Sequence, residues 1–132
     1  MKLLLDTHIL LWWFEADSKL SAAQKRALKK AGPSAPLYVS DMSLWEIATL
    51  CELGRVRLKL PLRDWLERAT AAPLVERCGI SPAIASEVVA LPSTFPRDPA
   101  DRILVATARV LGATLMTRDE RILDAALVPT LQ

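Results

Sequence analysis

The sequence predicts an α/β domain built around a parallel sheet. Short apolar segments alternate along the chain with longer segments of helical periodicity, and capping or helix-ending residues separate the two kinds. With 132 residues, of which 52% are hydrophobic and 24% charged, the chain is long enough to bury one core. We therefore expect a single domain over residues 1–132, without an internal repeat, a low-complexity segment or a linker.

The first strand and the helix after it are the most apolar part of the chain. Residues 2–5 are typical of a short buried strand, and Asp6 or Thr7 can cap the following helix, residues 8–14, through a side-chain oxygen. That helix is apolar on every side, so one face meets the sheet while another must meet a second element or a partner subunit. Residues 21–30 follow as an amphipathic helix.

Strands and helices continue to alternate to the end of the chain. Further strands are expected at residues 37–39, 74–77 and 114–116, with a last edge strand from Val128, which makes four or five in all. Further helices are expected at residues 40–53, 62–71, 81–90 and 99–111, and from Arg118 onward with Thr117 as its cap.

Acidic residues recur where strands end and helices begin. The first strand is followed by Asp6, the second by Glu46, the helix at residues 99–111 opens with Asp98 and Asp101, and the strand at residues 114–116 is followed by Asp119. In a parallel α/β sheet, strand ends and helix N-termini gather along one edge, where ligands bind. We therefore expect these carboxylates to converge.

Each acid also has a structural interpretation. Asp98 is placed as an ordinary N-cap with Asp101 three residues later, and Ser/Thr-x-x-Glu capping pairs end at Glu46 and Glu120. The helix dipole favours such acids by up to about 1 kcal/mol. For Asp98 the capping interpretation is the better one. For Asp6 the functional one is better, because a carboxylate after a buried strand needs a partner.

Convergence of the acids favours a metal site. Two carboxylates about 5 Å apart repel by roughly 3 kcal/mol at an effective dielectric near 20, so three or four together take up protons or need cations. Hard oxygen ligands without a histidine or cysteine cluster suit Mg²⁺ or Mn²⁺, which activate water and stabilise a phosphodiester during displacement. Arg97, Arg102 and Arg118 stand among these acids and are then expected to contact phosphates.

Several other classes of protein fit poorly. One histidine, no G-x-S-x-G motif and only four glycines argue against a serine hydrolase or a glycine-rich phosphate loop. We expect His8 to be a packed or hydrogen-bonded helix residue, and the four tryptophans to lie in the core or an interface. The net charge of +2 does not by itself indicate a nucleic-acid binder, although Arg55, Arg57 and Lys59 form a separate basic stretch.

The expected location is a reducing cytoplasm. The chain has two cysteines, far apart in sequence, which argues against a disulfide framework or a zinc site. The apolar runs are far short of the roughly 20 residues that a membrane helix needs. A signal peptide is rejected because Asp6 and His8 interrupt the first apolar region and no small-residue cleavage site follows closely.

Four segments in order resemble the motifs of PIN-domain proteins. Residues 3–8 with 11–13 resemble their opening motif, residues 39–48 the second, residues 97–108 the third and residues 115–119 the fourth. The resemblance covers nearly the whole chain and is strongest to VapC-type toxins of bacterial type II toxin–antitoxin pairs. It implies a three-layer α/β/α fold with a central, mainly parallel sheet.

The resemblance also implies an activity and a set of site residues. VapC-type proteins are Mg²⁺- or Mn²⁺-dependent endoribonucleases, in which a metal-held water attacks the scissile phosphate. Carried over residue by residue, the metal-binding catalytic acids are Asp6, Glu46, Asp101 and Asp119, supported by Asp98, Thr7 and Thr117. The implied partners are RNA, a second copy of the chain in a homodimer, and a VapB-type antitoxin that inserts a segment over the acids.

The sequence departs from the family pattern and leaves alternatives open. Pro96 stands where relatives often have histidine, and Ala100 replaces a commonly aromatic residue. A PIN-type RNA-processing nuclease without a toxin role remains an alternative. A receiver-like phosphoacceptor domain fits less well, because only one acid follows the first strand and the last region lacks a lysine. The sequence does not name the RNA, although single-stranded loops expose the most accessible phosphates.

Overall fold

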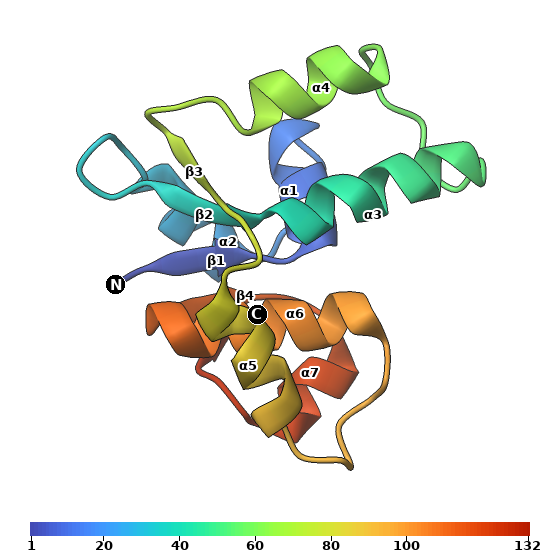
Figure 1. The fold of residues 1–132 in the computed structure, drawn as a ribbon. Helices are drawn as coiled ribbons and strands as arrows, with labels where there is room; N and C mark the ends of the chain where they lie inside the picture. Colours follow the sequence, from blue (N-terminus) through green and yellow to red (C-terminus); the bar gives the residue numbers. More distant parts are fainter.

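The computed structural model describes residues 1–132 as a five-stranded sheet between two layers of helices (Figure 1). All strand pairs are parallel. The spatial order is β3-β2-β1-β4-β5, and the strands are β1 Leu3–Leu5, β2 Leu37–Ser40, β3 Val75–Cys78, β4 Thr114–Met116 and β5 Thr130–Leu131. This confirms the predicted three-layer fold. It also excludes the receiver-like alternative, whose strand order is 2-1-3-4-5.

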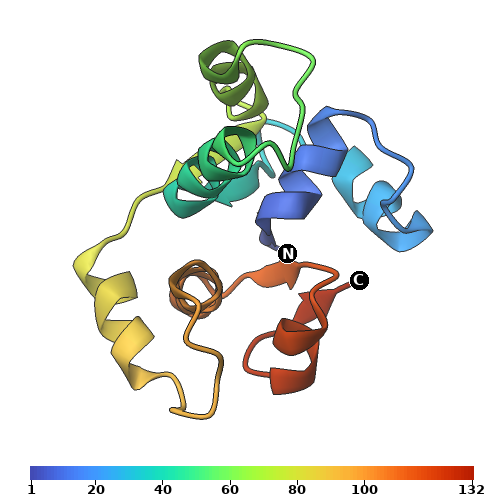
Figure 2. The ribbon, with the colours of Figure 1, turned by 90° about the vertical axis from the view of Figure 1, so that its right-hand side faces the viewer.

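Each face of the sheet has its own core and its own helices. One core lies beneath α1 Thr7–Phe14, α2 Ala22–Lys29, α3 Asp41–Glu52 and α4 Leu62–Ala69. The other lies beneath α5 Pro82–Ala90, α6 Pro99–Leu111 and α7 Glu120–Ala125. Figures 1 and 2 show these two layers above and below the sheet. Along β1, Leu3 and Leu5 enter the first core and Leu4 the second, as the two-residue period of a strand requires.

The helix caps settle where the helices begin. Asp6, rather than Thr7, caps α1 by accepting hydrogen bonds from the backbone amides of the next turn. Ser40 caps α3, so the proposed capping pair ending at Glu46 does not form. The prediction that Thr117 caps a helix from Arg118 is wrong, because Asp119 is the cap and α7 starts two residues later than expected.

The all-apolar helix α1 is largely accounted for by packing within the chain. Its buried residues contact the sheet, and the Phe14 ring packs edge-on against Trp65 of α4, with 5.2 Å between ring centroids. Trp12 and Trp13 are partly buried against the same core. Trp45 does not lie in the core, since 63% of its surface is exposed in the monomer, and a place in an interface stays a prediction for it.

None of the helices combines the length and hydrophobicity that crossing a bilayer requires. Both cysteines, Cys51 and Cys78, are free thiols.

Candidate active site

The predicted convergence of the acids is confirmed. Asp6, Glu46, Asp98, Asp101 and Asp119 all line one small cavity of about 110 Å³ at the carboxyl edge of the sheet. We call it the acid cavity. Its acids come from four separate parts of the chain, and it lies at the point where strand order reverses between β1 and β4, the usual ligand position in open parallel sheets.

Asp6 is the most deeply buried of these acids. Its Oδ1 accepts from the backbone amide of His8 at 2.8 Å, and its Oδ2 accepts from the Thr117 hydroxyl at 2.6 Å. Burial raises the pKa of Asp6, and the hydrogen bond from Thr117 opposes that rise. These contacts fix both carboxylate oxygens, and they are consistent with the supporting role predicted for Thr117.

Glu46 is held by the start of α1. The Thr7 hydroxyl, which is buried, donates to Glu46 Oε1 and also lies 3.0 Å from Ser43 Oγ. Thr7 therefore couples α1 to α3 and orients the Glu46 carboxylate. The supporting role of Thr7 is consistent with this geometry, and Ser43 is a further member of the network that we did not predict.

Arg121 joins the other two acids and was not predicted as a site residue. Its Nη2 lies 2.9 Å from Asp101 Oδ2 and 3.1 Å from Asp119 Oδ2, so one nitrogen bridges both carboxylates. The Asp119 side chain in turn accepts from the Arg121 backbone amide as the cap of α7. The guanidinium thus supplies positive charge to a cavity otherwise lined by acids.

The acids of the cavity differ in electrostatic character. Burial, reinforced by the neighbouring Asp98 carboxylate, raises the pKa of Asp101 to about 6, although Arg121 acts in the opposite direction. Burial would also raise the pKa of Asp119, but the hydrogen bonds and charge of Arg121 outweigh it and hold that pKa below its ordinary value. Like charges in one desolvated cavity therefore favour bound protons or cations.

The raised pKa of Asp101 predicts that, without metal, its own contribution to the stability of the domain is lost as pH rises. Between the ordinary value of 3.8 and about 6, the folded state binds more protons at Asp101 than the unfolded state, so the free energy of unfolding falls across that window. We expect a loss of about 1–2 kcal/mol, after allowance for solvent screening. Urea unfolding in EDTA at pH 4 and pH 7 measures it, and the Asp101→Asn variant should lose this component.

The donors of the acid cavity suit a hard divalent cation. They are carboxylates without a thiol, and two of them, Asp6 and Asp101, are buried enough to have raised pKa values. In the present side-chain arrangement no three acidic, imidazole or thiol groups are grouped closely enough to hold an ion. Arg121 already bridges two of the acids, so an ion that binds both would compete with its guanidinium for these carboxylates.

Comparison with known proteins assigns the fold to a family. A family model described as the PIN domain matches residues 3–127. This chain belongs to the PIN-domain family. It is also 41% identical over 119 residues to Ribonuclease VapC22 of Mycobacterium tuberculosis, a match that covers 90% of this chain and 88% of that protein. The predicted resemblance to VapC-type proteins is thereby confirmed.

Solved structures agree with the PIN-domain fold. VapBC2 from Rickettsia felis, bound to a DNA fragment from its promoter, matches with a TM-score of 0.73 over 99% of this chain and 98% of the matched chain, at 15% identity. VapBC-1 from nontypeable Haemophilus influenzae matches with a TM-score of 0.71 over 100% and 98%, also at 15% identity. At that identity the two structures establish the shared fold.

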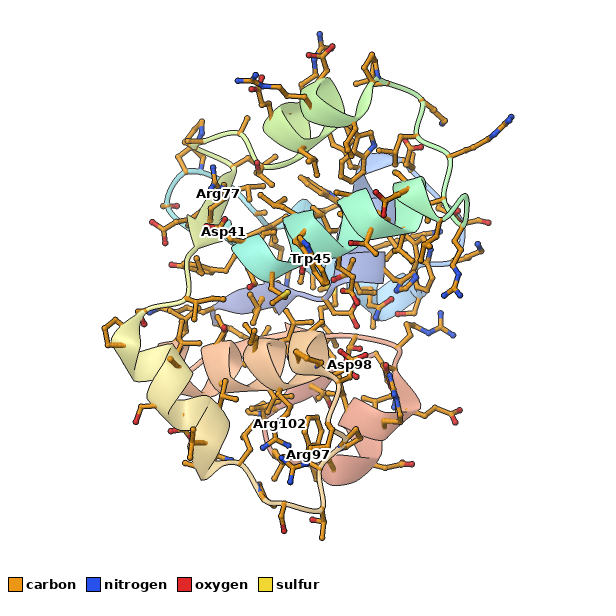
Figure 3. All side chains as sticks on the ribbon, turned by 45° about the vertical axis from the view of Figure 1, so that its right-hand side comes forward. Asp41, Trp45, Arg77, Arg97, Asp98 and Arg102 are labelled. Atoms are coloured by element: carbon orange, nitrogen blue, oxygen red, sulfur yellow. The ribbon has the colours of Figure 1, made fainter.

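Arg102 of this PIN domain is not placed to contact a phosphate, so that prediction is wrong. Its guanidinium is buried and donates to the backbone carbonyls of Phe95, Pro96 and Val88 at 3.2 to 3.4 Å. It lies on the side of α6 away from α3, whereas Asp98 lies at the N-terminal end of α6 (Figure 3). Arg102 therefore ties the loop before α6 to α5.

Replacing Arg102 by methionine is expected to lower stability by about 2–4 kcal/mol, because one buried and two partly buried carbonyls lose their donor. Urea unfolding followed by circular dichroism measures the loss. Arg97→Met is the matched control, since Arg97 is exposed, and its change should stay within about 0.5 kcal/mol. Equal losses in the two variants would contradict a structural role for Arg102.

The remaining predicted residues lie at or near the surface of the PIN domain. Asp98 caps α6, as its structural interpretation predicts, because its Oδ1 accepts hydrogen bonds from the backbone amides of Ala100 and Asp101. Arg97 is exposed, and Arg118 is exposed with its Nη1 donating to the Lys19 carbonyl at 2.7 Å. His8 is exposed at the cavity rim rather than packed inside.

Proposed function

We propose that this PIN domain is a divalent-metal-dependent endoribonuclease and the toxin of a toxin–antitoxin pair. The observation that carries the proposal is the convergence of Asp6, Glu46, Asp101 and Asp119 on one cavity. Sequence similarity also supports the proposal, since the chain is 41% identical to a protein named as a ribonuclease. A cluster of desolvated carboxylates at the carboxyl edge of a parallel sheet suits metal-assisted hydrolysis of a phosphodiester.

The four acids would hold Mg²⁺ or Mn²⁺, and a bound ion would activate water and stabilise the charge that develops on the phosphate and leaving oxygens. The chain's own contribution is preorganisation. Thr117 and the His8 amide orient Asp6, and Thr7 orients Glu46, which limits the freedom of both side chains before an ion binds. The exposed guanidinium groups of Arg97 and Arg118 are available for the RNA backbone.

The proposed partners are a VapB-type antitoxin, RNA, and a second copy of the chain in a homodimer. Two of the matched structures are VapBC proteins, which supports an antitoxin as the partner of this PIN domain. The bridge from Arg121 to Asp101 and Asp119 shows that the cavity accommodates a guanidinium. An antitoxin arginine inserted over the acids would supply positive charge in the same way.

Cleavage of a labelled single-stranded RNA tests the activity. We expect cleavage with Mg²⁺ or Mn²⁺, loss of cleavage in EDTA, and recovery when the ion is restored. Asp101→Asn should be inactive, whereas Asp64→Asn, at an exposed position of α4, should cleave as the wild type does. Undiminished cleavage in EDTA and in a folded Asp101→Asn protein would contradict the proposal.

A toxin and a processing nuclease differ in their effect on cells. Expression of the wild type is expected to arrest growth, and co-expression of the product of an adjacent small gene should relieve the arrest. Asp101→Asn should allow growth at the same protein level. Metal-dependent cleavage without growth arrest would favour the processing nuclease.

A further inference from the structure

A second cavity begins at the rim of the acid cavity. It has a volume of about 430 Å³ and lies between α1 and the segment that joins α3 to α4. His8 lines both cavities, so they meet at this side chain. We call the second cavity the basic groove, because Lys19, Arg55, Arg57 and Lys59 line it.

The segment between α3 and α4 is built to present its cations outward. Arg55, Arg57 and Lys59 are exposed, whereas the alternating residues Val56, Leu58 and Leu60 are partly buried against the core beneath α1–α4. The basic stretch therefore consists of cations on one side of a segment whose other side is packed. Its position in the fold is fixed by those apolar contacts.

The start of this segment is also fixed by the end of α3. Gly54 has a φ of 72°, its amide donates to the Cys51 carbonyl at 3.1 Å, and the Arg55 amide donates to the Leu50 carbonyl at 2.9 Å. This is a Schellman ending, in which glycine adopts the left-handed conformation and the chain turns away from the helix axis. Arg55 is thus directed by the backbone rather than by a long mobile loop.

The groove has more positive charge than its own acids neutralise. Glu15 and Asp17 are its acidic residues; the Glu15 carboxylate accepts from the Trp65 indole, and Asp17 lies 4.0 Å from Lys19. Arg55 and Arg57 form no side-chain hydrogen bond and no ion pair in the structure. Two free guanidinium groups beside a cavity of carboxylates suit a polyanion that extends out of that cavity.

The opposite wall of the groove carries aromatic rings. The His8 and Trp12 rings are 5.9 Å apart and tilted at 52°, and Lys19 Nζ lies 5.9 Å from the centre of the Trp12 ring. Cations that follow a backbone, together with rings on which bases stack, are the two features of grooves that bind single-stranded nucleic acid. An acidic peptide would bind the cations but would have no use for the aromatic rings, so the pair of features favours single-stranded nucleic acid.

We propose that the basic groove binds the backbone of the single-stranded RNA substrate next to the scissile phosphodiester. Arg55, Arg57 and Lys59 contact consecutive phosphates, and the wall formed by His8 and Trp12 faces the bases. A strand that passes His8 then presents its next phosphodiester to the acid cavity. This inference rests on the proposed ribonuclease function and adds to it the route of the substrate.

Binding of a labelled, unstructured single-stranded RNA in EDTA tests the groove without cleavage. The variant Arg55→Gln/Arg57→Gln/Lys59→Gln is expected to bind at least about tenfold more weakly than the wild type. Each phosphate contact contributes about 0.7 to the slope of log affinity against log salt, so the slope should shrink by about 2. In the metal-loaded enzyme the same variant should raise KM by about tenfold and change kcat little.

A matched control removes three charges elsewhere. Lys25, Lys29 and Lys30 are exposed at α2 or its end, and none of them lines the groove or the acid cavity. Their triple glutamine variant should keep the affinity and the salt slope of the wild type. A loss as large as that of the groove variant would overturn the proposal, because the effect would then come from net charge alone.

Three further outcomes are decisive. If the groove variant binds RNA as the wild type does but loses its complex with the antitoxin, the groove binds protein and the proposal is wrong. If the wild type binds RNA through the groove in EDTA but cleaves no RNA with any divalent ion, the proposed function fails while the groove stands. Wild-type cleavage with an unchanged KM in the groove variant overturns the groove alone.

Discussion

Replacing Asp6 by asparagine is expected to reduce RNA cleavage by at least about a thousandfold while the domain stays folded. A thousandfold loss corresponds to about 4 kcal/mol of transition-state stabilisation, within the range expected when a charged ligand of a metal-dependent site is neutralised. The reason is that both oxygens of this carboxylate are positioned by donors before any substrate binds. Single-turnover cleavage with saturating Mg²⁺ or Mn²⁺ measures the loss.

The fold should tolerate the Asp6→Asn change. Asparagine is as good an N-cap as aspartate, and its oxygen can still accept from the His8 amide. Its amide nitrogen can donate to the Thr117 hydroxyl oxygen, which reverses the present hydrogen bond. Because burial raises the pKa of Asp6, loss of the charge should leave the thermal midpoint at pH 7 unchanged or higher.

Asp124→Asn is the matched control for Asp6→Asn. Asp124 is an exposed acid of α7 that does not line the acid cavity, so its loss should change neither cleavage nor stability. Activity within tenfold of the wild type in a folded Asp6→Asn protein would show that this carboxylate is not essential. If the Asp6→Asn protein does not fold, Thr117→Val takes its place as the test, because valine removes the donor to Asp6 Oδ2 but keeps the side-chain shape.

The convergence of Asp6 and Asp119 was predictable because it depends on topology alone. Parallel strands end at the same edge, so any residue that follows a strand directly is brought there, whatever its side chain contacts. Asp6 follows β1 and Asp119 lies three residues after β4, and these two strands are neighbours in the sheet. No side-chain geometry was needed for this step.

The arginines were harder to assign because their roles depend on helix phase. Successive residues of a helix point about 100° apart, so Asp101 can face the cavity while Arg102, next to it, faces α5. At α7 the predicted start was two residues too early. Arg118 was chosen because it stands next to Asp119 in the sequence, and Arg121, which contacts the acids, was missed.

Trp65→Ala is expected to be among the most destabilising single changes in the domain, at about 3–5 kcal/mol. Trp65 has no exposed surface, its ring packs edge-on against Phe14, and its indole N–H donates to Glu15 Oε2 at 3.3 Å. Since small domains have only about 5–15 kcal/mol in total, much of the stability should be lost. Urea unfolding followed by circular dichroism at 222 nm measures it.

Two further tryptophan variants separate the origins of that loss. Trp65→Phe keeps an aromatic ring but removes the donor to Glu15, so it should cost less than the alanine variant. Trp45→Ala removes an indole that is 63% exposed on α3 (Figure 3) and should change the stability of the monomer by no more than about 0.5 kcal/mol. A loss below about 1 kcal/mol for Trp65→Ala would mean that α4 is not docked on α1. The segment that carries Arg55, Arg57 and Lys59 would then lack a fixed end at α4, and the order of the basic groove would have to come from its own apolar contacts.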